Sequence, residues 1–183
     1  MALITRRMVL AAGGTLAALA AAGKPRAQEL HALPDGLHPI DPPAPAPDIT
    51  FVDADGGEHH LDEFRGHGMV INLWATWCAP CVAEMPSLAA LEKALAPEDI
   101  AVLPLSSDRG GANAVAAFYR QHDIAGLPVL LDPHGAAARA FDARGIPTSV
   151  VIDKAGRAVA RLEGSADWST PAAMAAVRRL VAG

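Results

Sequence analysis

Along the chain, hydrophobic residues fall into short continuous runs that alternate with longer stretches in which every third or fourth residue is apolar. The short runs have the length of strands buried on both faces, and the spaced positions mark one face of an amphipathic helix. The runs occupy residues 69–74, 100–105, 129–131, 149–152 and 158–162. Strands that alternate with helices in this way predict an α/β fold around a largely parallel sheet.

Three helices are expected between or after these strands. Their apolar stripes are Met85, Leu88, Leu91 and Leu95; Val115, Phe118 and Tyr119; and Met174, Val177 and Leu180. Upstream, residues 49–52 and 58–61 flank the turn sequence Asp55-Gly56-Gly57, which predicts a leading hairpin. The short turn at residues 153–156 joins the last two strands, so these should run antiparallel and make the sheet mixed.

The first 27 residues differ from the rest and have the outline of an export signal. A basic start with Arg6 and Arg7 precedes 15 apolar and small residues, and Lys24 then restores polarity. This order is typical of a signal peptide, whereas spanning a bilayer takes roughly 20 apolar residues. Export followed by cleavage, after Ala22 or after Ala27, is therefore favoured over membrane tethering by an uncleaved signal.

The basic start fits two export routes. Residues 5–10, TRRMVL, resemble a twin-arginine signal, and they fit the start of a general secretory signal equally well. Both routes lead out of the cytosol, so the periplasm is the expected location. Cleavage after Ala27 would remove four basic residues and no acidic one, which would leave an acidic product.

Between the signal and the folded part, residues 28–47 form a proline-rich segment. Seven of the chain's 15 prolines lie within residues 25–47. Because proline lacks a backbone donor and the segment has few apolar residues, we expect an extended, poorly ordered tether. The folded domain is expected over residues 48–183.

Composition excludes several classes of function. The chain has 183 residues, of which 51% are hydrophobic, which suits one globular domain and is short for two. A formal net charge of -5 provides no basic surface for a phosphate backbone, so nucleic acid is not an expected partner. Two cysteines can neither complete a four-thiolate zinc site nor hold together a disulfide-rich scaffold. We therefore expect the two cysteines to act as a pair.

The two cysteines, Cys78 and Cys81, lie where an apolar strand ends and a helix begins. Their spacing lets them close a disulfide within one helical turn. Unpaired amides and the positive end of the helix dipole favour a thiolate there, and such cysteines have pKa values lowered from ~8.5 to roughly 3.5–7.5. Cys78, at the helix start, is expected to attack a client disulfide, and Cys81 to resolve the mixed disulfide.

Two other uses of a CxxC pair are open. The sulfurs could hold one soft metal ion such as Cu(I), or they could form an inert structural disulfide. A structural bridge over so short a loop would remove little entropy from the unfolded chain. The strand, tryptophan and helix around the pair favour redox chemistry over both alternatives.

Several short motifs of the domain carry a family resemblance. They are residues 72–81 (NLWATWCAPC), 84–86 (EMP) and 145–149 (GIPTS), and more weakly 166–168 (ADW). These motifs resemble the thioredoxin superfamily, and within it the TlpA/ResA-like exported thiol:disulfide oxidoreductases, with TlpA the nearer of the two. The likeness covers most of residues 48–181. It implies a thioredoxin fold with an N-terminal β-hairpin and a central strand–helix insertion.

The resemblance assigns roles to further residues. Pro147 would form the cis-proline loop that faces the redox pair, where backbone groups stay free to bind an extended peptide. Thioredoxin carries a buried aspartate where this chain has Asn72, which cannot act as a base. In TlpA/ResA-like proteins a glutamate stands one turn after the second cysteine, and Glu84 matches it. Glu84 would accept the resolving thiol's proton, or it would be a solvated helix residue.

The resemblance also implies a function and partners. A periplasmic reductase would pass electrons to disulfides of exported proteins, such as copper-delivery proteins, oxidase copper-site subunits or apocytochrome c. A membrane thiol-electron carrier would recharge it. The reaction needs no cofactor and no metal, and we expect a monomer. The surface that meets the partner would consist of Trp77, Ala79, Pro80, Ile146 and Thr148.

Two other functions are open at this point. A Cu(I)-binding chaperone would hold the metal between Cys78 and Cys81, although Sco-like chaperones space their cysteines by three residues and add a distal histidine. A thiol peroxidase resembles this fold, but it uses one peroxidatic cysteine framed by its own proline and threonine pattern. Tight Cu(I) binding without disulfide exchange would indicate the first function, and peroxide turnover the second.

Overall fold

The computed structural model describes residues 35–183, so the expected signal at residues 1–27 and the first part of the tether lie outside the described residues. No helix of this part is both long and apolar enough to cross a bilayer. The elements are β1 (Leu37–Pro45), β2 (Thr50–Asp53), β3 (Glu58–His60), η3 (Leu61–Phe64), β4 (Gly68–Trp74), α1 (Ala79–Leu95), η4 (Ala96–Glu98), β5 (Ile100–Ser106), α2 (Gly111–Gln121), β6 (Leu130–Leu131), α3 (Ala136–Ala140), β7 (Thr148–Ile152), β8 (Arg157–Glu163) and α4 (Pro171–Ala182).

An eight-stranded sheet forms the centre of residues 35–183, in the order β1-β8-β7-β4-β5-β6-β2-β3. β4 and β5 run parallel, whereas β7 is antiparallel to both β4 and β8. The sheet is therefore mixed, as the turn at residues 153–156 predicts. The predicted leading hairpin is β2 with β3, and the predicted insertion is β6 with α3, so the expected α/β architecture is confirmed.

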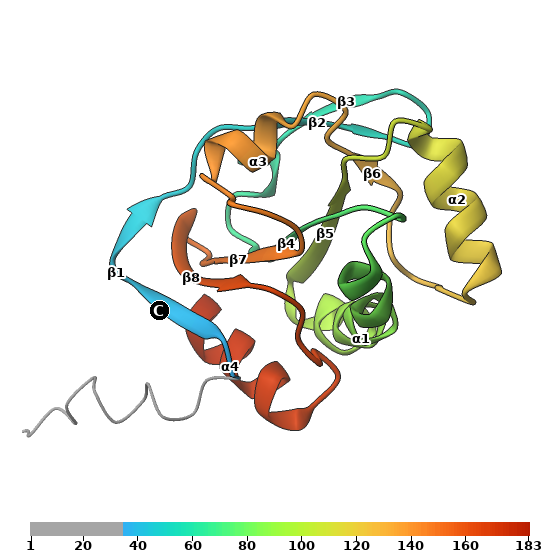
Figure 1. The fold of residues 1–183 in the computed structure, drawn as a ribbon. Coiled ribbons are helices and arrows are strands. Elements are labelled where there is room, and N and C mark those ends of the chain that lie inside the picture. The colour runs from blue at the N-terminus through green and yellow to red at the C-terminus, as the bar shows by residue number, and fades with distance from the viewer. Residues whose placement is uncertain (1–34) are drawn as a thin grey trace, which may run out of the picture.

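Helices cover both faces of the sheet, with α1 and α4 on one side and α3 on the other (Figure 1). In β4, Val70 and Trp74 join the hydrophobic cluster that contains residues of α1, α2 and α4. Ile71 and Leu73 join the cluster that contains the hairpin and α3. This alternation follows from the geometry of a strand, whose successive side chains point to opposite faces. β4 is buried along its whole length, and its last residue leads directly into the cysteine motif.

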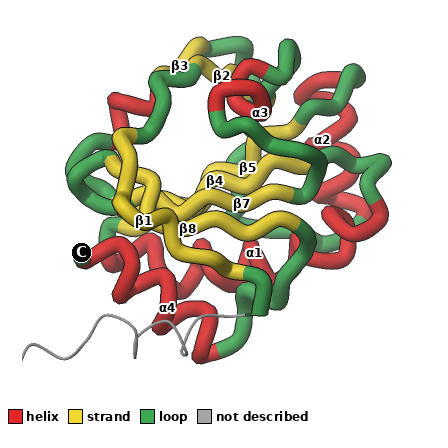
Figure 2. The backbone as a smooth tube through the Cα atoms, turned by 60° about the vertical axis from the view of Figure 1, so that its left-hand side comes forward, coloured by secondary structure: helices red, strands yellow, loops and turns green. Residues whose placement is uncertain are grey.

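The structure differs from the expected tether at residues 37–45. These residues form the edge strand β1, which pairs antiparallel with β8 (Figure 2). The pairing is irregular between Pro39 and Ala44. Prolines are compatible with this position because an edge strand has one side on which no neighbouring strand needs an amide donor. The expectation of a poorly ordered tether is therefore wrong for residues 37–45.

The first residue of β4 lies in close contact with α4. A Cβ added at Gly68 would overlap the side-chain methyl groups of Val181 on α4. Glycine at this position allows the last turn of α4 to pack onto the sheet.

Candidate active site

Cys78 and Cys81 form a disulfide at the start of α1, with their Cα atoms 5.2 Å apart. Cys78 is the N-cap residue of the helix, and its sulfur accepts a hydrogen bond from the backbone amide of Cys81 at 3.3 Å. β4 ends at Trp74, so residues 75–77 connect the buried strand to this cap. The pair therefore sits where the sequence predicts it, at a helix end whose free amides stabilise negative charge.

The two cysteine residues differ in accessibility. Cys78 is 7% exposed, whereas Cys81 is fully buried. Next to them, the side chain of Trp77 is 69% exposed, and it is the one large hydrophobic residue exposed in the described part of the chain. Ala79 and Pro80 are exposed as well. A partner that approaches this surface meets Trp77 and Cys78 before it can reach Cys81.

The loop before β7 faces the redox pair. The peptide bond between Ile146 and Pro147 is cis, as the resemblance implies, and the carbonyl oxygen of Ile146 lies 3.7 Å from the sulfur of Cys78. The hydroxyl of Thr148 donates a hydrogen bond to the carbonyl of Gly145 at 2.7 Å. Because Thr148 is buried, its side chain braces the loop from within and is not part of the exposed surface, contrary to expectation.

A buried carboxylate holds the loop that leads into the cysteine motif. Asp108 accepts hydrogen bonds from the amide of Thr76 at 2.8 Å and from the hydroxyl of Thr76 at 2.6 Å. It also accepts one from the hydroxyl of Ser106 at 2.7 Å. Thr76 is two residues before Cys78, so Asp108 fixes the backbone just ahead of the more accessible cysteine. No sequence motif quoted above points to Asp108.

Glu84 lies one turn after Cys81 and is only 3% exposed. One carboxylate oxygen accepts from the side-chain amide of Asn72 at 2.8 Å, and the other from the backbone amide of Ala166 at 3.0 Å. Burial raises the pKa of Glu84 from 4.5 to about 7, and these two donors oppose the rise. The indole N–H of Trp168 also opposes the rise in the pKa of Glu84, although its position does not have the geometry of a hydrogen bond. The alternative of a solvated helix glutamate is therefore wrong.

A groove of about 530 Å³ runs along the outer side of Glu84. Its lining comes from the first turns of α1 and from the segment before α4: Ala83, Glu84, Pro86, Ser87, Ser165, Ala166, Asp167 and Ser169. Ser87 links the two walls, because its hydroxyl oxygen accepts from the amide of Trp168 at 3.1 Å. The groove brings solvent close to the carboxylate of Glu84.

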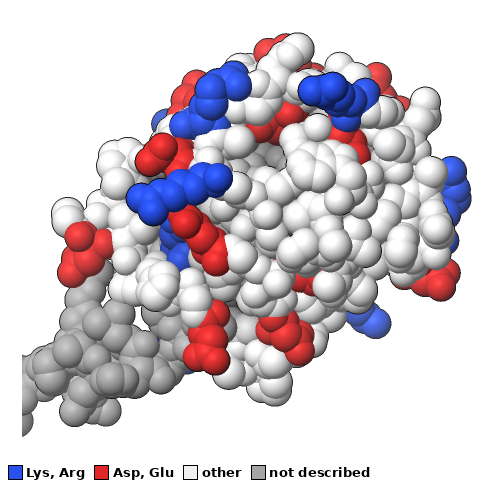
Figure 3. All heavy atoms as spheres, viewed as in Figure 1, with Lys and Arg blue, Asp and Glu red and all other residues white. Residues whose placement is uncertain are grey.

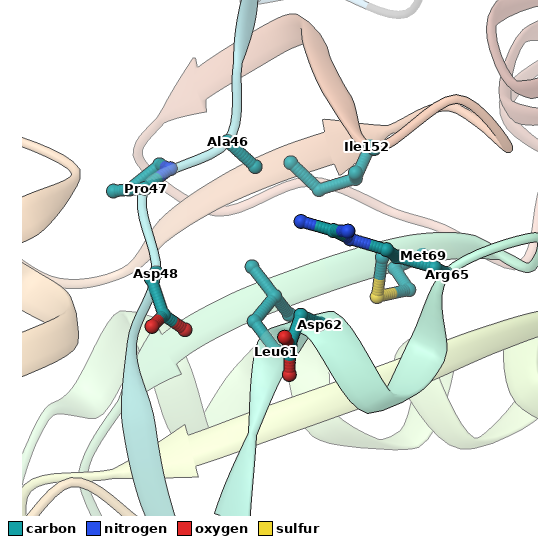
Figure 4. A pocket seen from close by; sticks show the side chains of 9 residues that line it. Ala46, Pro47, Asp48, Leu61, Asp62, Arg65, Met69 and Ile152 are labelled. Carbon is teal, nitrogen blue, oxygen red and sulfur yellow. The ribbon is translucent and has the colours of Figure 1, made fainter.

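A second, smaller hollow of about 130 Å³ lies at the opposite end of β4 (Figure 4). Leu61, Asp62, Arg65, Met69 and Ile152 are among the residues that line it, and the side chain of Arg65 extends between those of Ile152 and Leu61 in this view. Met69 is near the start of β4, whereas the cysteine motif follows the end of that strand. The hollow holds neither cysteine, so the redox chemistry belongs to the other end of the sheet.

No group of three or more His, Cys, Asp or Glu side chains within residues 35–183 is arranged to hold a metal ion.

On the face shown in Figure 3, acidic and basic side chains lie interspersed among uncharged ones. That face therefore has no basic patch of the kind that binds a phosphate backbone.

Comparison with known proteins identifies the family. A sequence model of the AhpC/TSA family matches residues 42–161, which include the whole site described above except the segment before α4. The chain belongs to the AhpC/TSA family. The thiol-disulfide oxidoreductase ResA of Bacillus thuringiensis is 32% identical over 119 residues, which are 65% of this chain and 68% of the relative. The thioredoxin-like protein YneN of Bacillus subtilis is 32% identical over 113 residues, 61% of this chain and 65% of the relative.

Solved structures that are similar to this chain agree with the sequence relatives. The exposed lipoprotein thioredoxin of Streptococcus pneumoniae superposes with a TM-score of 0.61 and 26% identity, over 73% of this chain and 99% of that chain. A thiol:disulfide interchange protein of Chlorobium tepidum gives a TM-score of 0.60 and 25% identity, over 76% and 94% of the two chains. The thioredoxin fold and the ResA-like resemblance are thus confirmed, and the protein is a thiol-disulfide oxidoreductase with the pair Cys78 and Cys81. The expectation that TlpA is the nearer group stays a prediction.

The structure of this AhpC/TSA-family oxidoreductase brings together most residues that the sequence singles out. Ile146 and Pro147 reach the disulfide through the carbonyl contact to Cys78, and Trp77 lies exposed beside it. Glu84 lies behind the pair and contacts β4 through Asn72. Sequence reasoning gave no role to several hydrogen-bond partners in the site. These are Asp108 and Ser87, and also Ser149, Ala166 and Trp168, which it cited only as parts of motifs.

Proposed function

We propose that this protein is an exported thiol:disulfide reductase, which passes electrons from the dithiol of Cys78 and Cys81 to disulfides in other exported proteins. The observation that carries the proposal is the asymmetry of the two sulfurs. Cys78 caps the helix, accepts the amide of Cys81 and is the more exposed, whereas Cys81 is buried behind it. This arrangement suits one sulfur for attack and the other for release of the client.

The reaction exchanges two covalent bonds. The thiolate of Cys78 attacks one sulfur of the client disulfide, and the other client sulfur leaves as a thiolate. Cys81 then loses its proton and attacks the sulfur of Cys78, so the second client sulfur leaves. The client has gained two electrons and becomes a dithiol, and the protein ends as the disulfide seen in the structure. The positive end of α1 stabilises Cys78 as the attacking thiolate.

In this scheme Glu84 accepts the proton of Cys81. Both residues lie on α1, one turn apart, on the side that faces the core. A pKa of about 7 lets the carboxylate take up and release a proton near neutral pH. The groove that Glu84 lines provides contact with solvent, so the proton can leave after each cycle.

The client is expected to bind as an extended segment across the exposed surface next to Cys78. Trp77 supplies an aromatic contact, Ala79 and Pro80 form the adjoining surface, and the backbone around Ile146 offers main-chain hydrogen bonds. Clients are exported proteins with a reducible disulfide, such as copper-delivery proteins, oxidase copper-site subunits or apocytochrome c. A membrane thiol-electron carrier reduces the protein back to its dithiol form. The protein acts as a monomer.

Export is the part of the proposal that rests on residues 1–27. Their basic start and apolar middle are the pattern of a signal peptide. One structural neighbour is described as an exposed lipoprotein thioredoxin, which supports a place outside the cytosol for this fold. An exported reductase must work in an oxidising compartment, which is why it needs a donor.

The reduction potential against glutathione tests the direction of the reaction. We expect a value near that of a reducing thioredoxin, about -270 mV. A value near that of a strong disulfide-forming catalyst, about -120 mV, would show that the protein oxidises its clients. Stoichiometric Cu(I) binding by a protein that exchanges no disulfide would replace the proposal by a copper-chaperone function. Turnover of peroxide in place of protein disulfides would replace it by a peroxidase function.

A further inference from the structure

A buried polar bridge connects Glu84 to the centre of the sheet. The side-chain amide of Asn72 donates one hydrogen to Glu84 at 2.8 Å and the other to the hydroxyl oxygen of Ser149 at 3.0 Å. Asn72 and Ser149 are fully buried and face each other as register partners on β4 and β7. Ser149 is two residues after Pro147, so the bridge joins the helix of the redox pair to the strand that carries the cis-proline loop.

The hydrogen-bonding capacity of these groups depends on whether Glu84 is charged. As a carboxylate, Glu84 only accepts, and the donors hydrogen-bonded to it are the side chain of Asn72 and the backbone amide of Ala166. As a carboxylic acid, it needs an acceptor for its own proton. A backbone amide cannot accept, whereas an asparagine side chain can present either its NH₂ group or its oxygen.

The second polar atom of Asn72 fits this requirement. Its Oδ1 atom is buried and has no hydrogen-bond partner. A half-turn of the amide would bring Oδ1 toward Glu84 and Ser149, where it could accept from the carboxylic acid and from the serine hydroxyl. The two NH₂ hydrogens would then lie where Oδ1 lies now, with two buried donors unpaired in place of one acceptor. The bridge therefore fits the carboxylate better than the acid.

We propose that Asn72 is a positioning residue that keeps Glu84 in its proton-accepting form and turns its amide when the proton arrives. This inference builds on the proposed role of Glu84 and adds the residue that tunes it. The aspartate of thioredoxin at this position would act as the base itself, whereas here the strand supplies a neutral partner and the helix supplies the base.

Few other groups can influence the charge on Glu84. The titratable groups that face it are Cys81 on α1 and Asp167 in the segment before α4, which shares its groove. β4 and β7 contribute the neutral side chains of Asn72 and Ser149, and among the described residues no basic side chain is bonded to Glu84. A change at Asn72 should thus appear directly in the titration of Glu84.

The test follows the carboxyl carbon of Glu84 by ¹³C NMR during a pH titration of the oxidised protein, in which the disulfide-bonded cysteines do not titrate. Glu84→Gln assigns the signal. In the wild-type protein we expect a midpoint near 7. Asn72→Ala removes a donor to the carboxylate and should raise this midpoint by about one to two units. An unchanged midpoint in Asn72→Ala would overturn the inference.

Ser149→Ala is the matched control, because it removes a buried hydroxyl from the same layer and leaves the donor to Glu84. We expect its midpoint to move by less than about half a unit, so a shift as large as that of Asn72→Ala would show a general effect of lost polarity. Asn72→Asp serves if the alanine variant does not fold. It has the same volume and places a second carboxylate against Glu84, so the upper midpoint of the pair should lie above that of the wild-type protein.

The failure of this inference and that of the proposed function give different results. The pH profile of the resolving step, measured by stopped-flow release of a client, should shift in Asn72→Ala in the same direction as the NMR midpoint. In the Glu84→Gln background, Asn72→Ala should cause no further shift. If Glu84→Gln leaves the profile unchanged, Glu84 is not the proton acceptor, yet the NMR titration still decides whether Asn72 tunes it.

Discussion

Replacing the carboxylate of Glu84 by an amide should stabilise the folded protein at alkaline pH. Glu84 is 3% exposed, and burial raises its pKa from 4.5 to about 7. An acid with a higher pKa in the folded than in the unfolded chain binds more protons when the chain is folded, within the range between these values. Stability is therefore highest below pH 4.5 and falls as the pH rises through about 7.

The size of this loss follows from the two pKa values. One unit corresponds to roughly 1.4 kcal/mol, so the change from 4.5 to about 7 gives a loss of about 3 kcal/mol at alkaline pH. Glutamine carries no charge, and the variant Glu84→Gln should not show this loss. Its NH₂ group meets one of the two N–H donors of Asn72 and Ala166, which adds a pH-independent cost of about 1 kcal/mol.

Urea unfolding of the oxidised protein at about pH 4 and about pH 8.5 measures the effect. The free energy of unfolding of Glu84→Gln, relative to that of the wild-type protein, should increase by about 3 kcal/mol from the lower to the higher pH value. Glu92→Gln is the matched control, because Glu92 lies on the same helix, is partly buried and accepts the amide of Val102 at 2.6 Å. The increase in the free energy of unfolding should be smaller for Glu92→Gln than for Glu84→Gln. A pH-independent difference between Glu84→Gln and the wild-type protein would refute the burial argument.

Three further predictions concern the scaffold. Asp108→Ala leaves both donors of Thr76 without an acceptor, so it should lower the free energy of unfolding in urea by about 2–4 kcal/mol and slow disulfide exchange; a loss below about 1 kcal/mol would contradict the anchoring role. Gly68→Ala places a Cβ against α4 and should lower the thermal midpoint through a loss of about 1–3 kcal/mol; an unchanged midpoint would argue against the close contact. Hydrogen bonds to Asp53 first, and to Glu63 second, raise the pKa of His59. The stabilisation that protonated His59 gives to the folded protein is therefore complete below pH ~6.5, and it is lost as the pH rises through the raised pKa of the folded state. The difference in urea midpoint between the wild-type protein and His59→Gln should be larger in mild acid than in base, and an equal difference would exclude this ion pairing.

The parts of the site that could be predicted from the sequence are those with local signals. Cys78 and Cys81 are close in sequence and lie at a strand–helix junction that the hydrophobic pattern marks. Glu84 follows on the same helix, so helical spacing places it on the side of Cys81. Pro147 is distant in sequence, but the family resemblance supplies its place next to the pair.

The partners of these residues could not be predicted, because strand register and loop packing decide them. Asn72 meets Ser149 across 77 positions, and a shift of β7 by one residue would turn Ser149 to the opposite face. Asp108 reaches Thr76 only because β4 and β5 end side by side. The burial of Glu84 follows in the same way from the segment before α4, which a helical pattern alone does not place.

The proline-rich segment departs from the expected tether for a physical reason. Missing amide donors weaken a strand in the middle of a sheet, so the prolines of residues 28–47 predict a loss of regular structure. At the edge, β8 supplies all the pairing that β1 needs, and the outer side of β1 faces no other strand. The prolines there also keep this edge from pairing with another chain.

The reaction of a reduced Cys81→Ser variant with a disulfide-containing client tests the account most directly. Without the resolving sulfur, the mixed disulfide should accumulate, and peptide mass spectrometry should place its bond at Cys78. Cys78→Ser should form no such adduct, because the remaining sulfur at position 81 is buried in the folded protein. An adduct through Cys81, or no adduct with either variant, would contradict the claim that the sulfur at the start of α1 begins the exchange.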